Sequence, residues 1–177
     1  ISTAAKARSS SPSSFSFCVV ADVVFETKAQ EIILECFQQL PQAQAELHFY
    51  GGGPDLERLQ GLARTLPNVW VHGRKTNEEV LQLLPNHDAL VLHSHYETFG
   101  ITVFEARTAG LWAVSKSSFG GAPWYDDGVL IADSQEALID QMKSLVRAEK
   151  APVGKFLSLS SESIGAEIHQ FYREILG

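Results

Sequence analysis

The feature that most constrains the fold is a regular alternation along the chain. Short apolar runs rich in β-forming residues are followed by segments of helical length, in which apolar residues recur three or four positions apart. This alternation is typical of a mostly parallel sheet covered by helices. We therefore predict a Rossmann-like, three-layer α/β domain with a mainly parallel sheet of about six strands. Strands are expected at 15–24, 46–51, 69–73, 89–94, 111–116 and 129–133, and helices at 29–40, 54–66, 76–86, 99–110, 134–149 and 166–176.

The composition predicts one folded domain behind a short polar segment. Residues 1–14 are small, polar and serine-rich, so we interpret them as a linker or disordered terminus. The remaining residues, 15–177, belong to a chain that is 45% hydrophobic and 20% charged, which suits a single apolar core. Because the chain opens at Ile1 rather than Met, we expect a fragment or a processed product.

The charge and the hydropathy pattern exclude two classes of partner. A net charge of -7, with no basic run, opposes binding to nucleic acid. No apolar run is long enough to span a bilayer, so we expect a cytoplasmic protein without a transmembrane segment. The two cysteines, Cys18 and Cys36, lie in apolar and helical patterns and predict neither a disulfide nor a cysteine metal site.

Two junctions between a strand and a helix are candidates for a ligand site, because ligands of open α/β sheets bind at the carboxyl ends of the strands. At the first, three glycines from Gly51 to Gly53 precede Pro54. Glycines there allow a phosphate to approach main-chain amides, but they also occur in purely structural turns, and both interpretations stay open at this point.

The second junction carries two carboxylates around one helix start. Glu97 precedes a helix that is expected to begin near Phe99, and Glu105 lies inside that helix. Side chains of a helix lean toward its N-terminus, so both carboxylates are expected to frame the same free amides. The amides would attract a diphosphate and the carboxylates would accept hydrogen bonds from ribose and sugar hydroxyls. The simpler alternative is a helix-start acid and an unrelated surface residue.

Four histidines near strand ends, His72, His87, His93 and His95, raise the question of a metal. Their spacing is not diagnostic of zinc. We predict hydrogen-bonding histidines and no metal site.

A family resemblance extends along nearly the whole folded region. Ser94, Glu97, Phe99, Gly100 and Glu105, followed by Ala106 and Ala109–Gly110, resemble the paired-glutamate signature of the retaining family-four glycosyltransferases. The remaining matches are Lys28, Gly51, Gly53–Pro54, Gly73 and Gly120–Gly121. The resemblance implies that residues 15–177 form the C-terminal, nucleotide-sugar-binding half of a GT-B fold.

The resemblance also implies roles for individual residues. Glu105 would bind the ribose hydroxyls, and Glu97 would bind the transferred sugar. Lys28 would contact the diphosphate and stabilise the leaving group. The remaining donor-binding residues would be Gly53, Arg74 beside the base, and the main-chain amides of Gly100, Ile101 and Thr102.

The implied activity is transfer of a sugar from a UDP-, GDP- or ADP-linked donor to an acceptor hydroxyl with retention. It needs no protein nucleophile, metal or cofactor. The acceptor site of the family lies largely on an N-terminal lobe, which these residues lack. We therefore expect that lobe, or a partner chain, to complete the enzyme, and the isolated chain to be inactive. Any membrane association is expected to be peripheral and to involve the missing half.

Departures from the family pattern keep other functions open. The family usually has an arginine about five residues before the lysine, where this chain has Asp22 and two valines. The glycine after the first glutamate is Thr98, and the proline after Leu111 is Trp112. The main alternative is a catalytically inactive glycosyltransferase-like module that acts as a protein-interaction scaffold. A sugar-phosphate epimerase of the same architecture is a third possibility.

Overall fold

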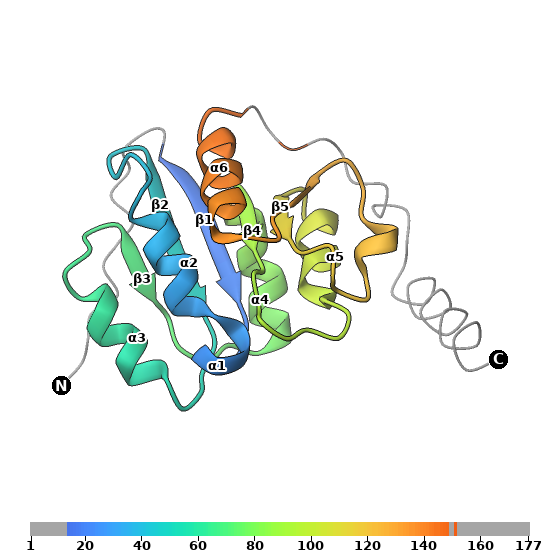
Figure 1. Ribbon diagram of the computed structural model, residues 1–177. Coiled ribbons are helices and arrows are strands. Elements are labelled where there is room, and N and C mark those ends of the chain that lie inside the picture. The colour runs from blue at the N-terminus through green and yellow to red at the C-terminus, as the bar shows by residue number, and fades with distance from the viewer. Residues whose placement is uncertain (1–13, 149–150, 152–177) are drawn as a thin grey trace.

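The computed structural model describes residues 14–148 and 151, and within them it contains one parallel six-stranded sheet in the order β3-β2-β1-β4-β5-β6 (Figure 1). Each strand runs parallel to its neighbours, as in β1 and β2, where Phe15 pairs with Ala45 and Val20 with Tyr50. The predicted fold class is therefore confirmed. The strands are β1 (Phe15–Val20), β2 (Ala45–Tyr50), β3 (Val69–Val71), β4 (Ala89–Val91), β5 (Trp112–Ser115) and β6 (Val129–Ile131).

Helices cover both faces of the sheet and complete three layers (Figure 1). The helices are α1 (Phe25–Lys28), α2 (Gln30–Phe37), α3 (Leu56–Ala63), α4 (Asn77–Leu83), α5 (Ile101–Thr108) and α6 (Gln135–Leu145), with short 3-10 turns η1 (Leu84–Asn86) and η2 (Ala122–Trp124). On one face α2, α3 and α6 bury a core with Phe17, Phe37 and Met142 at its centre. On the other face α4 and α5 bury a second core around Leu90 and Val103.

The alternation of strand side chains explains why the chain has two cores. Phe17 and Val19 point to the face of α2 and α6, while Cys18 between them belongs to the opposite core. This is the period of two that a strand imposes on a doubly covered sheet. Both cysteines are free and buried, as expected.

Several element boundaries differ from the sequence prediction because side chains and glycines redirect the backbone. The first strand ends at Val20 rather than continuing to residue 24. The helix expected from Pro54 begins at Leu56, and the carboxylate of Asp55 instead accepts a hydrogen bond from the amide of Phe25 at 2.9 Å. The helix expected near Phe99 begins at Ile101.

The strand order places the topological switch between β1 and β4. The chain leaves β1 toward α1 on one face and leaves β4 toward α5 on the other, so the two exits diverge above the carboxyl edge of the sheet. Ligands of open α/β sheets bind at this kind of position.

Two predictions concern residues beyond the described part of the chain. They are the polar segment before residue 14 and the helix at 166–176. Within the described residues, no helix is long and apolar enough to span a membrane.

Candidate functional site

An ion pair lies at the topological switch point between β1 and β4. Lys28, the last residue of α1, donates from Nζ to Glu97 Oε2 at 2.7 Å, and both side chains are largely buried. The main chain holds them in place, because the amides of His95 and Tyr96 both donate to the carbonyl oxygen of Thr27. The structure thus brings together the two residues to which the sequence assigned catalytic roles, although they lie 69 positions apart.

The second glutamate lies in the helix that starts just beyond this ion pair. Gly100 is the N-cap of α5 and adopts φ +79°, a left-handed conformation that favours glycine. The next two amides, of Ile101 and Thr102, lie in the first turn, where a helix leaves its N–H groups without intrahelical acceptors. Glu105 is partly buried one turn further, and burial raises the pKa of its carboxyl. A partly desolvated carboxylate is a strong hydrogen-bond acceptor for hydroxyl groups.

The glycine loop after β2 has a structural explanation. A Cβ at Gly51 or at Gly53 would collide with the carbonyl oxygens of Ala21 and Val23 respectively, because the loop after β1 packs directly on this loop. The amide of Val23 donates to Gly52 at 2.9 Å across the same contact. Close packing of two main chains therefore accounts for these glycines, and donor binding by Gly53 stays a prediction.

Asp22 and Arg74 form an exposed ion pair beside that loop. Nη2 of Arg74 lies 3.2 Å from Oδ1 of Asp22, with 72% and 63% of the two side chains exposed. A Cβ at Gly52 would lie 3.1 Å from Nε of Arg74, so the arginine covers the middle of the glycine loop. Asp22 thus points at Arg74, the residue expected beside the base, and neutralises part of its charge.

The loop between β5 and η2 is hydrogen-bonded to the segment that precedes α5. The amide of Gly120 donates to Thr98 at 2.9 Å and that of Gly121 to Phe99 at 3.1 Å. The hydroxyl of Tyr125, directly after η2, lies 2.9 Å from Oγ of the buried Ser115, which ties the end of η2 to β5. Burial raises the pKa of Tyr125, and the nearby Glu97 carboxylate adds to this.

A fully buried ion pair anchors the segment between η2 and β6 to α5. Nε and Nη2 of Arg107 lie 2.8 and 3.3 Å from the two carboxylate oxygens of Asp126, and Nη1 donates to the carbonyl oxygen of Leu111. The Asp126 carboxylate also accepts from the amide of Gly128 at 3.0 Å. This pair was not predicted from the sequence, although a charged residue in the apolar stripe of α5 is a signal that could have suggested it.

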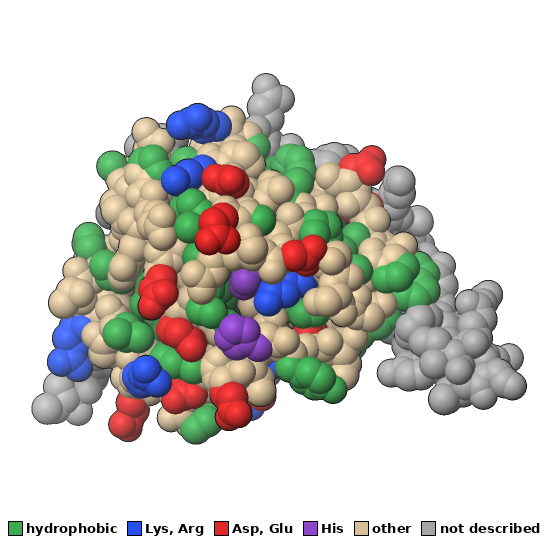
Figure 2. Space-filling view, in the orientation of Figure 1, with side chains coloured by type: hydrophobic (Ala, Val, Ile, Leu, Met, Phe, Trp, Pro, Cys, Tyr) green, Lys and Arg blue, Asp and Glu red, His purple; other side chains and the backbone are tan. Residues whose placement is uncertain are grey.

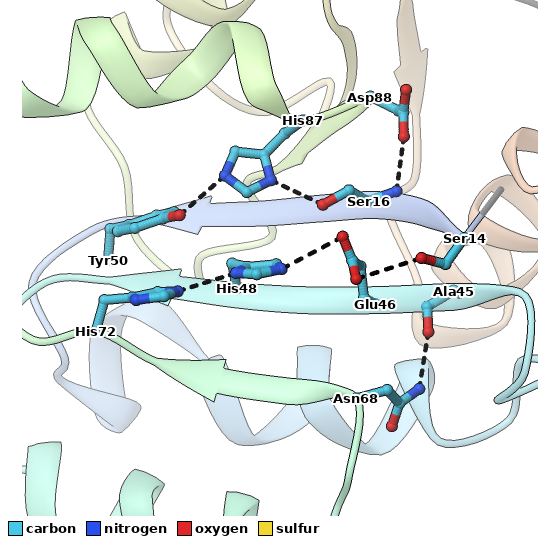
Figure 3. Close-up of polar contacts among 10 residues, drawn as sticks. All are labelled: Ser14, Ser16, Ala45, Glu46, His48, Tyr50, Asn68, His72, His87 and Asp88. Atoms are coloured by element: carbon cyan, nitrogen blue, oxygen red, sulfur yellow. Dashed lines mark hydrogen bonds and ion pairs between the residues drawn. The ribbon is translucent and has the colours of Figure 1, made fainter. Parts of the chain in front are cut away.

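The histidines near the strand ends divide into two groups. On the α4 face, Nδ1 of His48 lies 2.9 Å from Nε2 of His72, and Nε2 of His87 lies 2.9 Å from the Tyr50 hydroxyl (Figure 3). His48 and Tyr50 each stack on His72, with ring centroids 5.2 and 4.5 Å apart. Hydrogen-bonding roles are therefore confirmed for His72 and His87.

His93 differs from this group. It is 3% exposed, and neither ring nitrogen has a hydrogen-bond partner among the described residues. Main-chain groups of Ser134 and Ala132 nevertheless lie near enough to the ring to raise its pKa against the lowering effect of burial, so a hydrogen-bonding role for His93 stays a prediction. No cluster of three or more His, Cys, Asp or Glu residues in the described ranges is arranged to hold a metal ion.

Comparison with known proteins places these features in a family. The model of the family described as glycosyl transferases group 1 matches residues 3–153. The chain belongs to this family. The match includes every residue to which the sequence analysis assigned a site role.

Two relatives are similar in sequence over part of their length. A sulfoquinovosyl transferase of Arabidopsis thaliana is 33% identical over 96 residues, which cover 54% of this chain and 18% of the relative. An alpha-D-kanosaminyltransferase of Streptomyces kanamyceticus is 26% identical over 165 residues, which cover 84% of this chain and 43% of the relative. The chain thus spans less than half the length of these relatives.

Solved structures of glycosyltransferases share the fold. TarM of S. aureus aligns with a TM-score of 0.71 at 20% identity and covers 89% of this chain and 35% of its own. The lipopolysaccharide outer core galactosyltransferase WaaB aligns with a TM-score of 0.67 at 21% identity, over 78% of this chain and 42% of its own. These likenesses support the predicted identification as part of a GT-B fold.

Proposed function

We propose that this domain is the donor-binding half of a retaining glycosyltransferase that transfers a sugar from a nucleotide sugar to an acceptor hydroxyl. The observation that carries the proposal is the Lys28–Glu97 pair, which lies at the switch point directly before the start of α5. It combines a cation, a carboxylate and free helix-start amides in the place where a diphosphate sugar would need them. The UDP in the TarM structure supports a nucleotide ligand for this fold.

Each residue has a role that its position permits. The ammonium of Lys28 has three donors, so it can keep one bond to Glu97 and give another to a phosphate oxygen. The amides of Ile101 and Thr102 would hold the same diphosphate, and Glu105 would accept from the ribose hydroxyls. Arg74 would lie along the base.

In this proposal the chemical contribution of the domain is stabilisation of the leaving group. As the bond from the anomeric carbon to the diphosphate breaks, negative charge grows on the phosphate oxygen that faces Lys28 and the helix start. Glu97 orients the sugar, and the departing phosphate takes the proton of the attacking acceptor hydroxyl on the same face. No protein nucleophile is needed, and the acceptor would be held by a lobe or partner chain outside these residues.

The test is calorimetric titration of the 177-residue chain with UDP, GDP and ADP. We expect saturable binding of one nucleotide, weakened about ten-fold or more by Lys28→Ala and by Glu105→Ala, because each removes a charge-assisted hydrogen bond. Lys75→Ala is the matched control, since Lys75 pairs with Glu79 on the surface of α4. Absence of binding to all three nucleotides by a folded sample would contradict the proposal and favour a scaffold function.

A further inference from the structure

One lysine at the carboxyl edge of the sheet has no counter-charge in direct contact. Lys116 follows β5 directly and its side chain is partly buried. Two other cations of this edge are paired, Lys28 with Glu97 at 2.7 Å and Arg74 with Asp22 at 3.2 Å. The side chain of Lys116, in contrast, forms no ion pair or hydrogen bond with any of the described residues. Its ammonium is therefore available to a ligand.

The acid that faces Lys116 from the next strand is already engaged. The carboxylate of Asp133, after β6, accepts bonds from the amide and the hydroxyl of Ser117 at 2.8 and 2.7 Å. Burial lowers the pKa of the Lys116 ammonium, and Asp133 opposes this only in part, without forming an ion pair. A partly desolvated cation without a counter-charge is unfavourable until an anion pairs with it. In a chain of net charge -7, this edge thus carries a local positive charge.

The pairing of β4 and β5 places Lys116 beside the candidate site. The two strands are parallel neighbours, and just beyond β4 the amide of Leu92 donates to Val114 at 2.9 Å. Lys116 therefore lies next to His93, where its charge adds to the effect of burial in lowering the pKa of that imidazole. Figure 2 shows a basic side chain beside histidines near the middle of this face. Adjacent strands are about 4.8 Å apart, so Lys116 is one strand away from the segment that carries Glu97.

The strand order also indicates which part of a donor would meet Lys116. In the proposed function, the base lies at Arg74 after β3, the diphosphate at Lys28 after β1, and the sugar at Glu97 after β4. These strands follow one another across the sheet in the order β3-β2-β1-β4-β5, so the donor runs along the edge toward β5. Lys116 is the next cation in that direction among the described residues. It would thus lie at the sugar end of the donor, beyond Glu97.

We propose that Lys116 binds an acidic group of the transferred sugar, so that the donor is a nucleotide sugar with a carboxylate, such as a hexuronate conjugate. This inference rests on the proposed function, because it names the sugar of the same donor. An ammonium pairs with a carboxylate through charge-assisted hydrogen bonds, whereas a neutral sugar leaves its charge uncompensated. The acceptor is held outside these residues, so the sugar is the substrate part that this edge recognises. Lys116 orients the sugar and takes no part in bond breaking.

The test is calorimetric titration of the full chain with a nucleotide and two of its sugar conjugates. UDP, GDP and ADP are titrated first. The nucleotide that binds is then compared with its neutral hexose conjugate and the corresponding hexuronate, such as UDP-glucose and UDP-glucuronate. We expect the wild type to bind the hexuronate about ten-fold more tightly than the hexose, roughly the effect of one charge-assisted hydrogen bond. Lys116→Met should abolish this preference and leave the affinity for the free nucleotide within about two-fold.

Two further variants separate the role of Lys116 from that of overall charge. Lys143→Met makes the same change in net charge at an exposed lysine in the last turn of α6, so it should keep the preference for the hexuronate. Lys116→Arg retains a cation at the site and should keep the preference as well. Because Lys116 has no ion pair among the described residues, Lys116→Met should unfold at the urea midpoint of the wild type. Its loss of preference would therefore not reflect loss of the fold.

Several results would overturn the inference. A wild type without preference for the hexuronate, or a preference that survives Lys116→Met, would do so while leaving the proposed function intact. An equal loss in Lys143→Met would assign the effect to net charge instead of Lys116. If Lys116→Met weakened the free nucleotide as much as the hexuronate, Lys116 would contact the diphosphate and the assignment to the sugar would be wrong. Failure of the wild type to bind any nucleotide would instead remove the proposed function, and this inference with it.

Discussion

The buried Arg107–Asp126 pair provides the sharpest prediction about stability. Both side chains are almost completely inaccessible, with 0% and 4% exposure, and two bonds of 2.8 and 3.3 Å join them. Asp126→Asn would leave the guanidinium in the core without its counter-charge. Removal of one partner from such a pair typically costs about 3–5 kcal/mol, which is a large part of the roughly 5–15 kcal/mol that stabilises a domain.

The two single substitutions should not be equivalent. After Arg107→Met, Asp126 can take up a proton and become neutral, whereas the guanidinium that remains after Asp126→Asn cannot lose one. We therefore expect Asp126→Asn to cost more than Arg107→Met. Because proton uptake is easier in acid, the stability of the Arg107→Met protein relative to wild type should fall as the pH rises.

The assay is urea unfolding followed by circular dichroism for the wild type, both single variants and the double variant. The double variant Arg107→Met with Asp126→Asn keeps an acceptor for the Gly128 amide and buries no charge, so it should recover much of the larger single loss. A loss of less than about 1 kcal/mol for Asp126→Asn, or strictly additive losses, would refute the reasoning.

Three further predictions follow from individual contacts. Asp22→Asn should release Arg74 and remove a negative charge from the donor site, so calorimetry should show nucleotide binding about two- to five-fold tighter; weaker binding would contradict this. Since unfolded His93 has an ordinary pKa of 6.5 and folded His93 one of about 4, the unfolded state binds more protons between these values, and acid destabilises the fold. The stability that the neutral His93 contributes is fully present above pH 6.5. The free energy of unfolding, measured in urea, should fall by about 2 kcal/mol between pH 7.5 and pH 5, and His93→Leu should abolish this loss. Thr76→Ala removes one half of the capping box of α4 and should cost about 1 kcal/mol, whereas an unchanged midpoint would mean that α4 does not need its cap.

Local patterns determined the elements and the positions of the candidate residues. Six strands and the helices α2 to α6 follow from periodicities of two and of three to four, because each depends on residues close together in the chain, whereas α1 was not predicted. The helix after Glu97 was also predicted, although it begins at Ile101, after the N-cap Gly100, rather than near Phe99. The boundaries were less exact, since Asp55 bonds to Phe25 rather than capping its own helix.

Only the tertiary structure decided which side chains meet. Lys28 and Glu97 are 69 positions apart, Asp22 and Arg74 are 52 apart, and no local pattern shows that they form ion pairs. The packing of two loops explains Gly51 and Gly53, and the burial of His93 is likewise visible only in the tertiary structure. The physical reason is that secondary structure depends on neighbours in sequence, whereas burial, charge pairing and polar satisfaction depend on which distant segments the sheet order brings to one edge.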